Sequence, residues 1–380
     1  MLQTYVGYTN FSLIMTEREQ QVLALIRENP LISQAAIAGR LGISRPAVAG
    51  HIMKLVAKGV IKGRGYVLSE APYAVVVGGA NIDICGAPAT ELRMRDSNPG
   101  RVTATPGGVA RNIAENLARL GVDTRLVTAI GADYHGELLC TQAESAGIDM
   151  RYVLELEAQP TSTYVSVLDD TGDMLVGIND MSIVEEITPD YLQRHEPLLR
   201  RSGLLIADAN LTEESLGYLA RSFGGEPLFV DAVSVAKARR LLPIIDAVHS
   251  LKVSLAEAQA ICGIRTTRDS SLPKLASWLH ERGVARVFIT LGAGGVDYSD
   301  GGEEGIEKPA ESPSGVVSAS GAGDAFVAGL AFAWLSDWSL ARSVRFATSA
   351  AEVTLAHAAA INPAMSAETV IRHSEERHAG

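Results

Sequence analysis

The amino-acid sequence predicts an α/β protein whose main domain is a doubly wound, mainly parallel sheet, preceded by a small winged helix-turn-helix domain. From residue 73 onward, short apolar strands alternate with helical segments, a pattern typical of parallel sheets covered by helices on both faces. Residues 16–69 instead show three helical segments separated by short turns. The length of 380 residues and the apolar fraction of 47% fit two domains with a sizeable core.

The charge distribution separates the same two parts of the chain. Residues 16–68 carry eight basic and three acidic side chains, whereas residues 69–380 carry 25 basic and 41 acidic ones. No apolar run reaches the roughly 18–20 residues that cross a bilayer, and the N-terminus lacks the order of a signal peptide. The cysteines are far apart and lack metal-ligand spacing, so we expect reduced thiols, a cytoplasmic location and no membrane association. They are Cys85, Cys140 and Cys262.

The N-terminal domain is expected over residues 16–69, after a tail of residues 1–15 to which we assign no function. Thr16 opens a capping box, so a helix is expected to start there. A second helix is expected from about Ser33 to Leu41, and Ser44 caps a third. Residues 60–68 are expected to form the hairpin of a wing. The inward positions of the third helix are expected to be Val48, Ile52, Leu55 and Val56.

This arrangement favours DNA binding, with the third helix in the major groove. Arg45, His51 and Lys54 are expected on the exposed face of that helix. Lys62 and Arg64 are expected at the wing, where cations contact phosphates. The alternative is a protein-interaction or dimerisation module with a solvated basic face. Because one copy would bind DNA weakly, a homodimer is expected.

In the second domain, strands are expected at residues 74–78, 126–130, 204–207, 228–230 and 287–291, and a helix at 112–120. Residues 161–181 predict a hairpin with its turn at residues 170–172. We expect this hairpin, together with an irregular stretch at 86–105, to form a small β lid over the site. The alternative is an edge extension of the main sheet.

The run Gly321-Ala322-Gly323-Asp324 is expected at the start of a helix. Free backbone N–H groups at the positive end of the helix dipole would hold phosphate oxygens there. Bound phosphate would repel Asp324 unless that carboxylate takes the proton from a hydroxyl attacking phosphorus. The simpler alternative is a tight turn with Asp324 as a helix cap.

Four further stretches stand at strand ends or helix starts, at residues 79–83, 105–112, 252–257 and 290–295. In this order, and together with residues 321–326, they resemble the ribokinase-like (PfkB) carbohydrate and nucleoside kinases over about residues 73–375. The runs Pro106-Gly107-Gly108-Val109-Ala110-Arg111-Asn112 and Gly321-Ala322-Gly323-Asp324-Ala325-Phe326 together make this resemblance specific.

Within the family, the sequence is most similar to the pseudouridine kinases. The similarity lies in residues 96–100, 106–121, 178–181 and 207–210. It implies transfer of a phosphoryl group from ATP, with Mg²⁺, to the 5′-hydroxyl of pseudouridine. The family pattern does not include an N-terminal winged helix.

The resemblance implies a role for each matching residue. Asp324 becomes the base, and Gly321, Ala322 and Gly323 supply N–H groups to the transferring phosphoryl group. The sugar-binding positions are Asp83, Gly107, Gly108, Asn112 and Asn210. The positions that we assign to the base are Asn98, Asn179 and Asp180, although Asn98 before Pro99 is also typical of a turn. The positions near ATP are Ser254, Glu257, Thr290, Gly292 and Gly294, with Glu257 holding Mg²⁺ through water.

Arg111 either neutralises phosphate charge or only caps toward solvent. The sequence departs from the family at Val253 and Ser254, where relatives carry Pro and Asn. It also has Ser318 where ribokinase has a carboxylate for a monovalent cation, so potassium dependence stays open.

Three functions follow from these residues. The first is a pseudouridine kinase fused to a DNA-binding domain. The second is a kinase for another nucleoside or a sugar. The third is a nucleoside-sensing transcription regulator without turnover, which the departures at Val253 and Ser254 favour and Asp324 opposes.

Overall fold

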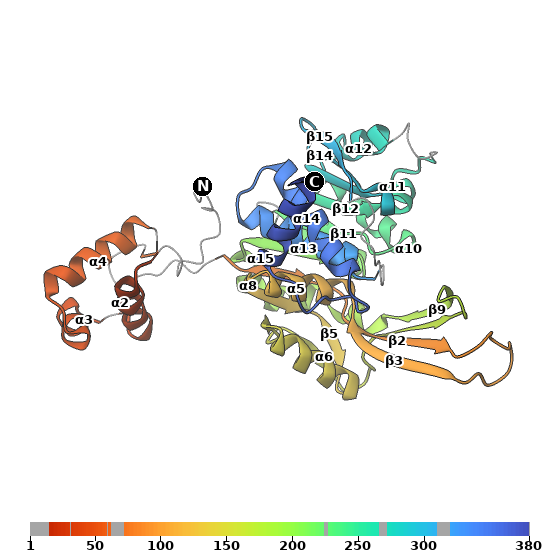
Figure 1. Cartoon of the computed structure of the whole chain (residues 1–380), viewed down its shortest axis with the longest axis horizontal. Coiled ribbons are helices and arrows are strands. Elements are labelled where there is room, and N and C mark those ends of the chain that lie inside the picture. Colours follow the sequence, from red (N-terminus) through yellow and green to blue (C-terminus); the bar gives the residue numbers. More distant parts are fainter. Residues whose placement is uncertain are drawn as a thin grey trace. The chain divides into compact units, whose positions relative to one another are not determined.

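The computed structural model describes residues 15–30, 32–58, 60–61, 72–223, 227–265, 272–309 and 320–379. The chain divides into two compact units between Ala71 and Pro72 (Figure 1). Among the described residues, no helix has both the length and the apolar character needed to cross a bilayer.

The described residues of the N-terminal unit form three helices: α2 (Glu17–Glu28), α3 (Gln34–Leu41) and α4 (Arg45–Ala57). The predicted capping box is confirmed, because the Thr16 hydroxyl accepts from the Glu19 amide and Glu19 accepts from the Thr16 amide. Ser33 and Ser44 cap α3 and α4 through their hydroxyls. The three helices close over a small core that includes Val22, Ile26, Ile37, Val48, Ile52 and Leu55.

The exposed face of α4 differs from the prediction at two positions. Arg45 and Lys54 are exposed as expected, but His51 is only partly exposed and its Nδ1 is buried. Val56, expected in the core, is 49% exposed because it lies off the helix stripe that Ile52 and Leu55 occupy. Lys62 and Arg64 lie outside the described residues, as do residues 1–14 and most of the predicted wing.

The second unit is built on a nine-stranded sheet in the order β15-β14-β13-β12-β11-β10-β1-β4-β6. The strands from β13 to β6 pair in parallel, and β14 and β15 extend the sheet antiparallel. The mainly parallel, doubly wound sheet is therefore confirmed. The strands are β1 (Ala74–Val77), β4 (Thr124–Val127), β6 (Ile148–Asp149), β10 (Leu204–Asp208), β11 (Leu228–Asp231), β12 (Ser250–Ser254), β13 (Arg286–Thr290), β14 (Val296–Ser299) and β15 (Glu304–Glu307).

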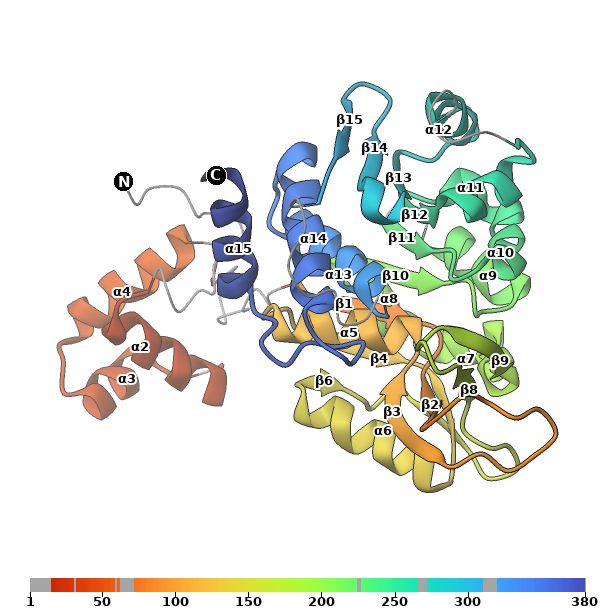
Figure 2. The same ribbon diagram turned by 45° about the vertical axis from the view of Figure 1, so that its right-hand side comes forward.

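Helices cover both faces of this sheet (Figure 2). One group contains α5, α13, α14 and α15, and the other contains α9 to α12. The helices are α5 (Val109–Arg119), α6 (Tyr134–Ser145), α7 (Pro189–Arg194), α8 (Glu196–Arg200), α9 (Glu213–Ser222), α10 (Val235–Ala238), α11 (Leu255–Cys262), α12 (Leu272–His280), α13 (Ala322–Leu335), α14 (Leu340–Leu355) and α15 (Ala367–Ala379), with 3-10 turns η1 (Ser182–Glu186), η2 (Arg239–Ala247) and η3 (Gly292–Gly294).

A second sheet of four strands projects from the main one, in the order β3-β2-β8-β9 (Figure 1). The hairpin predicted at 161–181 is confirmed as β8 (Thr163–Leu168) and β9 (Met174–Asp180). The stretch at 86–105 is not irregular, because its two ends belong to β2 (Asn81–Pro88) and β3 (Gly100–Gly107), which pair antiparallel. Both predicted lid segments thus share one sheet.

Three predicted boundaries were wrong. The strand expected at 126–130 splits at Thr128, because β5 (Ala129–Gly131) leaves the main sheet to pair with β7 (Leu154–Leu156). Helix α5 begins at Val109, three residues before the predicted start. Lys252, Val253 and Ser254 belong to strand β12 instead of following it.

Helix α13 lies between α5 and α14, and small side chains let the helices approach closely. A Cβ added to Gly329 of α13 would lie 2.6 Å from the Cα of Ala347 in α14. Such a distance is shorter than any real contact, so the backbones would have to separate.

The Gly329→Ala substitution is therefore expected to lower the free energy of unfolding of this unit by about 1–3 kcal/mol. Gly217→Ala is the matched control, since Gly217 is also inside a helix but its Cβ would meet only the flexible end of Arg221. The control should be neutral or stabilising by up to about 1 kcal/mol. Urea denaturation followed by tryptophan fluorescence reports on this unit, because Trp278, Trp334 and Trp338 all lie in it. Equal effects of the two substitutions would contradict the packing argument.

Candidate active site

The carboxyl ends of β1 and β10 are joined by the buried side chain of Asp208. Its Oδ2 accepts from the amides of Gly79 and Ala110 at 3.0 Å each, and its Oδ1 accepts from the Asn210 amide at 2.9 Å. Burial raises the pKa of Asp208 despite these three bonds. One carboxylate thus aligns the loop after β1, the start of α5 and the loop after β10.

The predicted phosphate-binding site is the start of α13. Gly321 adopts the left-handed conformation with φ of +78°, and a Cβ there would collide with the carbonyl oxygen of Ala360. No side chain of the described residues caps this helix, so the alternative of Asp324 as a helix cap does not fit. The first amides of the helix are therefore available to an anion.

Asp324 lies in the first turn of α13 and is only 9% exposed. Burial raises its pKa to about 8, with a further contribution from the charge of Asp231. The hydrogen bond from Asn112 opposes this shift. A carboxylate with its pKa near neutrality fits a general base.

Helix α5 carries a buried set of polar side chains toward Asp324. The Asn112 Nδ2 donates to Asp324 Oδ2 at 2.8 Å, while the Asn112 Oδ1 accepts from Arg111 at 3.5 Å. Arg111 pairs with Glu115 at 2.6 Å and is 3% exposed, so of its two alternatives the cap toward solvent does not fit. These contacts orient the Asn112 amide toward Oδ2 of Asp324.

The predicted sugar-binding residues meet beside this set. The Asp83 Oδ1 accepts from Asn81 Nδ2 at 2.6 Å, and burial raises the pKa of Asp83. Gly107 packs directly against the Asp83 carboxylate, where a Cβ would collide with it. Gly108 has φ of +99°, and a Cβ there would lie 2.6 Å from Cα of Ala80.

Asn210 belongs to the same edge of the sheet. Its Oδ1 accepts from the Lys237 ammonium at 2.5 Å, which only the carbonyl side of the amide can do. Its Nδ2 is therefore directed to Gly79. Lys237 therefore orients the Asn210 amide so that its NH2 group, and not its oxygen, faces Gly79.

The three residues assigned to the base are not grouped together. Asn179 lies in register with Tyr164, which lies in register with Asp83, so these three share one face of the four-stranded sheet. Asp180 is on the opposite face and accepts from Ser182. Asn98 bonds the backbone of its own loop, at Arg93 and Asp96, as the turn alternative expects.

The predicted nucleotide residues gather at β12 and β13, where Ser254 pairs with Thr290. The Ser254 hydroxyl accepts from the Glu257 amide, and the Glu257 carboxylate accepts from the Ser254 amide at 2.7 Å. They form a capping box for α11, and the Ser and Glu three residues apart are a signature of this helix start in the sequence. Gly292 and Gly294 form the turn η3 immediately after β13.

Sequence reasoning assigned no role to Asp208, Asp231 or Lys252. Asp208 and Asp231 end the apolar strands β10 and β11, and a carboxylate at such an end is a signal that could have found both. Lys252 lies two residues before Ser254 and so on the same face of β12.

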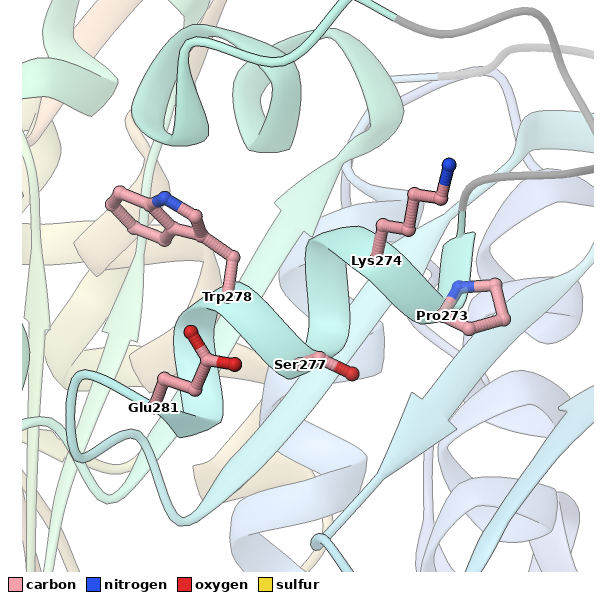
Figure 3. A pocket seen from close by; sticks show the side chains of 5 residues that line it. All are labelled: Pro273, Lys274, Ser277, Trp278 and Glu281. Carbon is pink, nitrogen blue, oxygen red and sulfur yellow. The ribbon is translucent and has the colours of Figure 1, made fainter.

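A pocket with a volume of about 310 Å³ lies elsewhere, on helix α12 (Figure 3). Residues of α12 and its end line it, and none of them belongs to the predicted site. They are Pro273, Lys274, Ser277, Trp278 and Glu281.

A buried carboxyl group of raised pKa, a helix start that no described side chain caps and an edge of polar side chains fit a phosphotransferase with an alcohol group as acceptor. Residues 71–367 match the pfkB family of carbohydrate kinases, and the chain belongs to that family. Residues 15–62 match the winged helix-turn-helix DNA-binding family. The predicted recognition, fold class and type of enzyme are therefore confirmed.

Two curated relatives come from Escherichia coli K12. The chain is 39% identical to a pseudouridine kinase over 80% of this chain and 97% of the relative. It is 38% identical to the uncharacterized sugar kinase YeiI over 94% of this chain and 98% of that protein. These relationships support a sugar or nucleoside kinase.

Solved structures agree with the fold. A carbohydrate kinase from Agrobacterium tumefaciens superposes with a TM-score of 0.71 at 28% identity, over 80% of this chain and 97% of that one. Arabidopsis thaliana ribokinase, solved with ribose and ATP, has a TM-score of 0.72 at 23% identity, over 80% and 99% of the two chains.

The raised pKa of Asp324 predicts a pH-dependent stability. In wild type, the unfolded chain ionises this group above pH 3.8 while the folded chain holds the proton up to about pH 8. Folding stability is therefore lost as pH rises through this window, by up to a few kcal/mol. Asp324→Asn cannot ionise and should be more stable than wild type at pH 8.5, with the difference disappearing near pH 4. Urea midpoints at the two pH values measure this, and a constant difference would contradict the raised pKa.

Proposed function

We propose that the chain transfers the γ-phosphoryl group of ATP to the 5′-hydroxyl of pseudouridine. The observation that carries the chemistry is the Asn112 hydrogen bond to Asp324, which joins the sugar-binding edge to the start of α13. The 39% identity to a pseudouridine kinase over 97% of that protein supports the substrate. Asn179 on the same sheet face as Asp83 gives a polar group for the base.

The proposed reaction uses Asp324 as base. In its ionised form the carboxylate takes the proton of the attacking hydroxyl at Oδ1, the hydroxyl oxygen forms a bond to the γ-phosphorus, and the bond from phosphorus to the β,γ-bridging oxygen breaks. The electron pair of that bond leaves with ADP. Asn112 holds Asp324 Oδ2, so the carboxylate keeps one orientation while the proton moves.

The start of α13 stabilises the charge that develops on the phosphoryl oxygens. The amides of Ala322 and Gly323 belong to the first turn, and Gly321 turns the chain so that they face outward from the helix end. Removing a comparable donor in other enzymes costs about 100- to 1000-fold in rate.

Mg²⁺ fits the available donors when it is bound mainly by phosphates and water. The described residues contain no group of three metal-ligating side chains, and Glu257 is a buried carboxylate on the nucleotide side. One carboxylate acting through water matches the preference of Mg²⁺ for keeping several of its own waters. Bound Mg²⁺ would neutralise charge on the phosphates of ATP.

Kinase activity on a sugar is the second candidate. The relative YeiI matches 94% of this chain, which includes the N-terminal unit, and it is described as a sugar kinase. Asp83, Asn112 and Asn210 would bind a free sugar as well as a nucleoside ribose.

We also propose that the chain is a homodimer. One face of the four-stranded sheet carries an apolar row in register, formed by Val102, Val167 and Val176. Val102 is 72% exposed and Val176 is 50% exposed. Covering this face with a second copy would remove apolar surface from water.

The substrate proposal predicts ADP release from Mg-ATP with pseudouridine in preference to uridine, other nucleosides and ribose. Asp324→Ala is expected to lower kcat by at least about 100-fold, because the proton acceptor is lost. Asp190→Ala, which removes an exposed carboxylate of α7, is the matched control and should retain activity. A preference for ribose would favour the sugar kinase instead. Binding of pseudouridine without any turnover would contradict the proposed enzyme activity and favour a nucleoside sensor.

We further propose that the N-terminal unit binds DNA through α4. Arg45→Ala with Lys54→Ala is expected to weaken binding to a labelled 30-base-pair duplex and to lower the slope of log affinity against log salt by about 1 to 2. Arg18→Ala with Arg27→Ala on α2 removes the same two charges from another helix and is the control. Equal losses in both variants would point to a general charge effect and contradict a role for α4.

A further inference from the structure

Lys252 lies where the nucleotide side of the site meets the start of α13. Its side chain is 14% exposed, and its Nζ is 3.1 Å from Asp231 Oδ2 at the end of β11. A Cβ added to Gly323 would lie 2.9 Å from the same Nζ. The ammonium therefore contacts the glycine turn whose amides form the proposed phosphate-binding site.

The surroundings of this ammonium are acidic. The carboxylates of Asp231, Glu257 and Asp324 are close enough to raise the pKa of Lys252, although burial alone would lower it. Lys252 therefore stays protonated at neutral pH. If Lys252 carried no charge, an incoming triphosphate would be repelled by these carboxylates. Only the partial positive charge of the helix end would attract it.

We propose that Lys252 is a catalytic residue that binds the transferring phosphoryl group beside Gly323, and that Asp231 positions its ammonium. This inference rests on the proposed kinase reaction. A cation at this place neutralises charge on the equatorial oxygens while the hydroxyl attacks from the side of Asp324. It forms no covalent bond and takes no proton.

The same arrangement accounts for the departure at Ser254. Ser254 and Glu257 bond each other as a cap for α11, so the Ser254 hydroxyl already has a partner. Lys252 is on the same face of β12 and is long enough to reach the start of α13. Charge near the phosphates is thus supplied from two residues earlier in the strand.

The test compares Lys252→Met and Lys252→Arg with wild type. Lys252→Met is expected to lower kcat by about 100- to 1000-fold with a smaller change in the KM for ATP, and Lys252→Arg should recover part of the loss. A second readout is equilibrium binding of Mg-ADP with aluminium fluoride, which imitates the phosphoryl group in transfer. Lys252→Met should lose most of the extra affinity for this analogue and keep its affinity for Mg-ADP alone. Lys274→Met, which changes a lysine on α12, is the control.

The outcomes separate this inference from the proposed function. Normal kcat and normal analogue affinity in Lys252→Met would overturn the role of Lys252 while leaving the kinase proposal intact. If wild type turns over no acceptor but binds the analogue in a Lys252-dependent way, the proposed function fails and the phosphoryl site remains. No preference of wild type for the analogue over Mg-ADP would overturn the role of Lys252 as well. Should Lys252→Met not fold, the double variant Lys252→Gln with Asp231→Asn removes both charges of that ion pair and should show the same loss of analogue affinity.

Discussion

The arrangement of the site depends on the buried carboxylate of Asp208. Its two oxygens hold amides from three segments that are far apart in the sequence, after β1, at the start of α5 and after β10. Those segments carry Asp83, Asn112 and Asn210. A neutral side chain could not accept three amide hydrogens, and each buried amide left without a partner would cost about 1–3 kcal/mol. Burying the Asp208 carboxylate costs solvation free energy, and its three hydrogen bonds to the amides offset that cost.

Charges are sorted along the edge of the main sheet. On the sugar side, Arg111 is buried against Glu115, and Asn112 donates a hydrogen bond to Asp324. On the nucleotide side, Lys252 is buried against Asp231. The pKa of Asp324 responds first to its burial, and then to the charge of Asp231, the hydrogen bond from Asn112 and the charge of Lys252. The same edge of the sheet thus brings the Asp324 carboxyl group and the Lys252 ammonium close enough for each to shift the pKa of the other.

Much of the fold could be predicted from sequence because its signals are local. Apolar runs predicted the main strands, and hydroxyl caps predicted the N-terminal helices. Helix α5 was placed too late because Gly108 opens it without a side-chain cap. Strands β2 and β3 were missed because their solvent-facing residues and glycines show no apolar run. The contact of Lys252 with Gly323 joins β12 to α13 across 71 residues of sequence, and no local pattern records such a contact. Asn179 and Asp180 were both assigned to the base, but adjacent residues of a strand point to opposite faces of the sheet.

The close packing of Gly329 against Ala347 has a consequence for the energy of the reaction. Helix α13 cannot rotate or slide without separating from α14, so the amides at its start keep their directions whether or not a phosphate is present. In water, dipoles must reorient around a developing charge, and this reorganisation adds to the barrier. Here the dipoles are oriented when the chain folds. Gly329 and Ala347 do not touch the site. Their close packing nevertheless lowers its reorganisation energy.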